Sequence, residues 1–169
     1  DALPILILGA KVLCVLVMAV PSFFLSLGFL YYSFAVPVQG SLAALAVMIT
    51  AFCLAVASIM VLFAVLSPDA VMSIEMPLLY IMPGLLYSGL SWPDFYMSDV
   101  AAAIAQIFPM RHAADSVRDI LLAGYAPALV SQSLQLLLMG AGAFVLGTAI
   151  FALRRRYGMK TFLEIAAGA

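Results

Sequence analysis

The sequence predicts an all-α, polytopic transmembrane helical bundle in which short interfacial helices precede the last span. Three runs without Asp, Glu, Lys or Arg carry this prediction, over residues 12–68, 76–93 and 120–153. A charge at the bilayer centre costs about 2.5 to 3.5 kcal/mol on insertion scales, so a membrane selects for such runs. The chain of 169 residues is 67% hydrophobic and 9% charged, whereas soluble domains average about 45–50% apolar and about 25% charged.

The longest run can form two crossings, because a helix rises about 1.5 Å per residue and about 20 apolar residues cross the hydrocarbon. Its natural break is residues 36–41, where Pro, Gly and polar side chains occur together. We therefore expect a first span over residues 5–34, with Lys11 near one end, and a second over residues 42–66. The Ser-Pro-Asp sequence at 67–69 ends the second span.

The third expected span covers residues 70–92 and contains helix breakers, Pro77 and the pair Pro83-Gly84. Proline removes a backbone hydrogen bond, and the residue before it resists the helical conformation. We therefore expect this span to be kinked or interrupted. The fourth expected span covers residues 127–153. Three arginines follow it directly: Arg154, Arg155 and Arg156.

Residues 93–125, between the third and fourth spans, combine charges with apolar residues at helical spacing. Their apolar positions fall into two groups: Val100, Ile104 and Ile107, then Ala113, Val117, Ile120 and Leu121. This pattern predicts two short amphipathic helices at the membrane interface. We expect the break between them at Phe108-Pro109, and a C-terminal cap at Gly124.

Basic residues set the expected orientation. The arginines after the fourth span, together with Lys160, indicate a cytoplasmic C-terminus. Four crossings then return the start of the first span to the cytoplasm and place residues 93–125 outside. Aromatic side chains gather at the same expected outer edge: Tyr31, Tyr32, Phe34, Tyr87, Trp92, Phe95 and Tyr96.

Several function classes lack support in the sequence. A net charge of −1 gives no general attraction to nucleic acid. Cys14 and Cys53 have no metal-site spacing and are interpreted as small apolar side chains. No zinc-protease or serine-hydrolase motif occurs, and His112 has no second histidine to pair with. The phosphate-binding loop is also missing, so we expect no ATP binding by this chain itself.

Glu75 is the acid nearest the interior of an expected span. Acids inside membranes serve substrate, proton or gating roles by default, which makes Glu75 a candidate pathway residue. The alternative is an interfacial acid at a helix start, where the helix dipole favours negative charge. Pro83 and Gly84 are candidates for flexibility within the same span.

Arg111, His112 and Arg118 are candidates for an outer gate or exit vestibule. The two arginines stand four and three positions from Asp115, so opposite charges can equally pair along one solvated helix face. Both interpretations remain open at this point. The arginine triplet after the fourth span is interpreted as a topology anchor rather than a lipid-specific site.

Two small-x-x-x-small pairs predict close helix contacts. They are Ala143 with Gly147 and Gly84 with Ser88. Small side chains at this spacing let two helix backbones approach each other. The pairs predict tight packing without naming a partner helix.

The order of short motifs resembles the membrane subunit of ABC-2 type transporters. Residues 7–11, Ile-Leu-Gly-Ala-Lys, open a span, and the Pro-x-x-Gly-Ser turn at 37–41 separates two spans. An S-G-x-x-x-P motif follows, at Ser88-Gly89 to Pro93. The F-P…R-x-I-L-x-x-G pattern runs from Phe108-Pro109 to Gly124. A last span ends in a basic cluster, so the likeness covers nearly the whole chain.

This resemblance implies an exporter permease. Family members have six spans, and the four expected here match the last four, so we expect the chain to be a fragment lacking two N-terminal spans. The implied partners are an ATP-binding cassette subunit, which holds ATP-Mg, and a second permease subunit in a homo- or heterodimer. The implied location is the bacterial inner membrane, and the implied cargo is a drug, lipid or polysaccharide-like molecule. A membrane scaffold or assembly module and an intramembrane enzyme remain alternatives.

Overall fold

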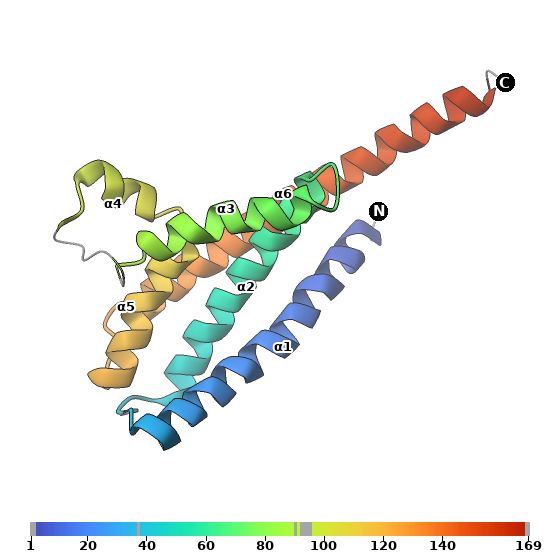
Figure 1. Ribbon diagram of the computed structural model, residues 1–169. Helices are drawn as coiled ribbons and strands as arrows, with labels where there is room; N and C mark the ends of the chain where they lie inside the picture. Colours follow the sequence, from blue (N-terminus) through green and yellow to red (C-terminus); the bar gives the residue numbers. More distant parts are fainter. Residues whose placement is uncertain (1–2, 37, 90, 92–95, 168–169) are drawn as a thin grey trace.

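The computed structural model describes residues 3–36, 38–89, 91 and 96–167, with side chains described up to Arg155. Six α-helices occur in these residues, and the described part of the chain contains no strand. The helices are α1 (Leu3–Phe34), α2 (Leu42–Leu66), α3 (Met72–Leu86), α4 (Asp99–Ala105), α5 (Pro109–Leu122) and α6 (Leu129–Ala167). The predicted all-α class is confirmed, and Figure 1 shows the arrangement of the helices.

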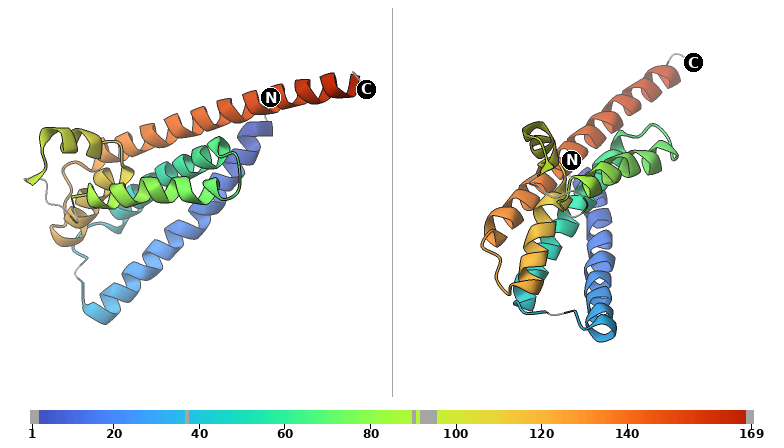
Figure 2. Two further views of the ribbon diagram at one scale, coloured as in Figure 1. Left: turned by 45° about the horizontal axis from the view of Figure 1, so that its top comes forward. Right: turned by 60° about the vertical axis from the view of Figure 1, so that its left-hand side comes forward.

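Three of these helices are long and apolar enough to span a membrane: α1, α2 and the part of α6 over Leu129–Arg155. Their bounds agree closely with three of the predicted spans, and α2 has the predicted bounds of 42–66. Apolar side chains surround these helices on all sides, which is typical of membrane spans. The C-terminal part of α6 extends beyond the rest of the bundle (Figures 1 and 2).

Helix α2 lies at the centre of the bundle and contacts α1, α3, α5 and α6. Its parallel neighbour α6 shares the most extensive contact with it. Glycines permit this close approach, since a Cβ added at Gly140 would lie 3.0 Å from the Ala55 Cα. Gly147 similarly faces Leu62, so one of the predicted small-residue pairs packs α6 against α2 within the chain.

Two apolar clusters stabilise opposite ends of the bundle. One gathers around Leu45, Met48 and Leu136, where α1 ends, α2 begins and α6 begins. The other joins Leu8 and Val61 at the opposite end. We call these regions the Gln39 end, after the α1–α2 loop, and the Arg154 end, after the first basic residue of α6.

The third predicted span differs from the other three. Helix α3 has 15 residues, which correspond to about 22 Å of rise, less than the roughly 30 Å of a bilayer core. It continues through Pro77 and Pro83 without interruption and ends at Leu86 instead of reaching residue 92. Asp69 accepts a hydrogen bond from the Met72 backbone N–H at 2.8 Å, which helps to begin the helix.

The segment before the last span forms two helices, as predicted, with the break at residues 106–108. Pro109 begins α5, a position where its missing N–H costs nothing. Gly124 follows the end of α5 with φ of +76°, so the predicted cap is confirmed. Predictions at Trp92, Pro93 and Phe95 lie outside the described residues.

One face of α5 is buried, so this helix packs along the bundle rather than only resting on a membrane surface. Its buried residues recur every three or four positions: Pro109, His112, Ala113, Ser116 and Ile120. The helix begins beside Val56 of α2 and ends beside the α1–α2 loop, where the Gln39 N–H donates to the Leu121 carbonyl at 3.0 Å. Helix α5 therefore covers the part of α2 that lies toward the Gln39 end.

Candidate functional site

A groove of about 650 Å³ opens between α1, α2 and α5. We call it the α1–α5 groove. Its walls are mostly apolar and include Phe23, Phe52 and Leu121. This volume lies within the range of roughly 300–1,000 Å³ that is typical of small-molecule sites.

Polar groups in the groove are few and lie on two of its walls. Ser22 and Ser26 line the α1 wall, and each hydroxyl donates to the carbonyl four residues earlier in its own helix. Their oxygens are therefore left as acceptors. Arg118 lines the α5 wall, and its Nη2 donates to Asp115 Oδ1 at 2.8 Å. The groove thus has an apolar interior and one charged side chain, which suits an amphiphile.

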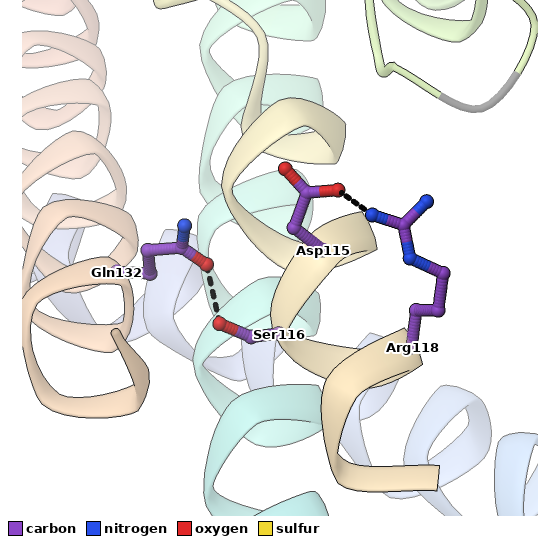
Figure 3. A network of polar contacts seen from close by, with 4 residues as sticks. All are labelled: Asp115, Ser116, Arg118 and Gln132. Atoms are coloured by element: carbon purple, nitrogen blue, oxygen red, sulfur yellow. Dashed lines mark hydrogen bonds and ion pairs between the residues drawn. The ribbon is translucent and has the colours of Figure 1, made fainter. Parts of the chain in front are cut away.

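The other side of α5 is held to α6 by a buried polar contact. The Ser116 hydroxyl donates to Oε1 of Gln132, and Ser116 is only 1% exposed. Figure 3 shows this pair on the α6 side of α5 and the Asp115–Arg118 pair on the other side. A buried hydroxyl left unpaired would cost about 1–3 kcal/mol. The contact therefore helps to set the rotation of α5 that turns Arg118 toward the groove.

An aromatic junction connects α3 to the start of α5. The Tyr80 hydroxyl donates to the Ile107 carbonyl at 2.7 Å, and its ring lies 5.1 Å from the Phe108 ring. Tyr87 stacks on the same Phe108 ring at 6.1 Å between centroids. The Phe108 ring also lies against Gly84, where an added Cβ would be 3.2 Å from Cδ1. These contacts join α3 to the start of α5.

The predicted candidates of the third span, Glu75, Pro83 and Gly84, lie in different parts of α3. Pro83 and Gly84 lie at the aromatic junction, and the Pro83 carbonyl accepts the Tyr87 N–H at 2.9 Å. Glu75 is exposed in the first turn of α3, toward the Arg154 end. This helix-start position is the one that the interfacial interpretation of Glu75 expects.

The predicted vestibule residues do not share one surface. His112 is buried, with Nε2 3.0 Å from the Gln106 carbonyl, whereas Arg118 lies on the exposed side of α5. Arg111 is half-buried. Only Arg118 of these three lines the α1–α5 groove. The Asp115–Arg118 ion pair is the pairing that the solvated-face interpretation expected.

The members of the arginine triplet differ in their contacts. Arg154 donates from Nη1 to the Val65 carbonyl at 2.6 Å and from Nη2 to the Leu66 carbonyl at 3.0 Å. These carbonyls end α2 and lack intrahelical partners, so Arg154 caps α2 from α6. Arg155 is exposed, and the side chain of Arg156 lies outside the described part of the chain.

Sequence reasoning missed several of these contacts. Tyr80, Ser116 and Gln132 carry no motif, and their partners lie 16 or more positions away in the chain. The cap by Arg154 joins positions 89 apart. The Phe-Pro motif was the available signal for the aromatic junction, because it marked where α5 begins.

Comparison with known proteins returns no match to this chain: no family model, no curated protein and no solved structure. The resemblance to ABC-2 permeases therefore depends on the short motifs and their order.

Proposed function

We propose that this chain is the membrane-spanning permease subunit of an ATP-driven ABC-2 type exporter. The proposed cargo is a drug, lipid or polysaccharide-like molecule that moves outward across the bacterial inner membrane. The observation that carries the proposal is the placement of α4 and α5 between α3 and α6, with α5 packed along α2. The resemblance implies short outer helices at this place, before the last span.

The proposed orientation follows from charge. The Arg154 end carries Lys11 and the arginines of α6, which favours a cytoplasmic location for this end. The Gln39 end and α5 then face outward. Helix α3, which rises about 22 Å, would form most of the third crossing.

The proposed transport step uses the α1–α5 groove and the aromatic junction. ATP binding and hydrolysis in a separate cassette subunit would move α3, and the contact of Gly84 with Phe108 would transmit that movement to α5. Displacement of α5 changes the groove, because Val117 and Arg118 form part of its wall. An amphiphilic cargo would then leave at the outer end. A second permease subunit would complete the transporter.

Vesicle transport tests this proposal. The protein is co-expressed with its cassette subunit, and inside-out vesicles are assayed for ATP-dependent accumulation of a fluorescent short-chain phospholipid and of a lipophilic dye. Accumulation of either probe that requires both ATP and the cassette subunit supports the proposal. A protein that neither co-purifies with a cassette subunit nor moves either probe contradicts it and favours a scaffold.

A matched pair of variants tests the groove itself. Ala114 lines the α1–α5 groove, so Ala114→Phe places a ring in it. We expect transport to fall about tenfold, which corresponds to roughly 1.4 kcal/mol. Ala103 is exposed on α4 and serves as the control through Ala103→Phe. Equal transport by the two variants would show that the groove is not part of the transport pathway.

A further inference from the structure

The Arg154 end contains a cavity of about 430 Å³ that gathers three cations. Lys11 comes from α1, and Arg154 and Arg155 come from α6. Apolar side chains complete the walls, among them Leu8, Val61 and Phe151. We call this cavity the basic pocket. None of the described residues that line it is acidic.

The charges in the basic pocket are incompletely compensated. Both terminal nitrogens of Arg154 donate to carbonyls at the end of α2, and these bonds hold its guanidinium at the pocket wall. Lys11 and Arg155 form no ion pair with any residue in the described ranges. Three like charges around one cavity repel one another, and a bound anion would relieve that repulsion.

The walls indicate what kind of anion fits. A small inorganic anion would draw no binding energy from the apolar side chains Leu8, Val61 and Phe151. An amphiphile can place its phosphate among the cations and its glycerol and acyl chains along the apolar wall. Basic pockets between transmembrane helices on the cytoplasmic side commonly bind anionic lipid headgroups.

We propose that the basic pocket binds the phosphate headgroup of an anionic phospholipid, held by Lys11, Arg154 and Arg155. The bound lipid would link α1 to α6 at the end of the bundle where α2 is capped. The site is separate from the α1–α5 groove, and its occupation requires neither ATP nor cargo. Its test is therefore independent of the proposed transport function.

The test measures lipid binding to the full chain in detergent. Phosphatidylglycerol, phosphatidylcholine and inorganic phosphate are each titrated, with native mass spectrometry to count bound lipid and thermal unfolding to follow stabilisation. We expect phosphatidylglycerol to bind and stabilise, and the other two to have much weaker effects. Equal stabilisation by phosphatidylcholine overturns the proposed headgroup, and equal stabilisation by inorganic phosphate shows a soluble-anion site and overturns the lipid.

Variants then locate the binding. Lys11→Gln and Arg155→Gln should each weaken phosphatidylglycerol binding about fivefold, and the double variant about thirtyfold. The charge-preserving controls Lys11→Arg and Arg155→Lys should stay near the unsubstituted affinity. Arg111 lines neither the basic pocket nor the α1–α5 groove, so Arg111→Gln removes one positive charge elsewhere and should not change the affinity. A loss with Arg111→Gln as large as with Lys11→Gln overturns the location.

Folding is checked by far-ultraviolet circular dichroism of each variant before titration. Arg154 is left intact in this series because it caps α2. If a glutamine variant fails to fold, the lipid preference of the unsubstituted chain still decides the proposal, because that preference needs no substitution.

Discussion

Replacement of Gly140 by isoleucine should separate α2 from α6. A Cβ at Gly140 would lie 3.0 Å from the Cα and 3.3 Å from the backbone nitrogen of Ala55. Backbone atoms cannot rotate away, so the larger side chain forces the helices apart. Gly142, half a turn along α6, has no atom within 4 Å of an added Cβ, and Gly142→Ile is therefore the matched control.

The magnitude follows from two opposing terms. Both substitutions gain roughly 0.5 kcal/mol from improved helix propensity. Overpacking at Gly140 costs about 1–3 kcal/mol, and Gly142→Ile does not incur this cost. The difference between the variants isolates the contact and should lower the unfolding midpoint of Gly140→Ile by about 2–12 °C relative to Gly142→Ile.

The assay is thermal unfolding in detergent, followed by circular dichroism. Ala55→Gly should not rescue Gly140→Ile, since the contacted atoms belong to the Ala55 backbone and remain after the substitution. Equal midpoints for Gly140→Ile and Gly142→Ile would refute the close α2–α6 contact. Rescue by Ala55→Gly would show that the side chain of Ala55, and not its backbone, limits the approach.

Three further substitutions test other contacts by the same unfolding measurement. Gly40→Ala should cost about 1–3 kcal/mol, because the new Cβ would lie 2.3 Å from the Ile120 carbonyl oxygen; an unchanged midpoint would mean that the loop does not touch α5. Arg154→Gln should cost about 1.5–3 kcal/mol through lost charge-assisted bonds to α2, and Arg154→Lys should recover part of that loss. Tyr80→Phe should cost about 1 kcal/mol by removing the bond to the Ile107 carbonyl, and a cost near zero would argue against that bond.

Local physics determined much of the fold. In a membrane each backbone N–H and C=O must be satisfied within its own segment, so long apolar runs become helices whatever their neighbours are. This is why the bounds of α2 and the end of α1 at Phe34 could be predicted from residue patterns. Breaks are local too, and Pro109 and Gly124 marked the start and the end of α5.

Only the tertiary structure decided which faces meet. Apolar residues surround α1, α2 and α6 on all sides, so their patterns do not indicate which side packs and which side faces lipid. For the same reason the burial of His112 and the direction of Arg118 could not be predicted, because they depend on how α5 is rotated against α2 and α6.

The charges near the chain ends also depend partly on the sequence and partly on the tertiary structure. The sequence by itself determined that Lys11 and the arginines of α6 flank apolar spans. Their convergence on one cavity, with Arg154 bonded to the end of α2, required α6 to pack parallel to α2 and antiparallel to α1. The residue pattern predicts which segments can lie in a membrane. The contacts across the bundle depend on which faces of three nearly uniform apolar helices pack against one another.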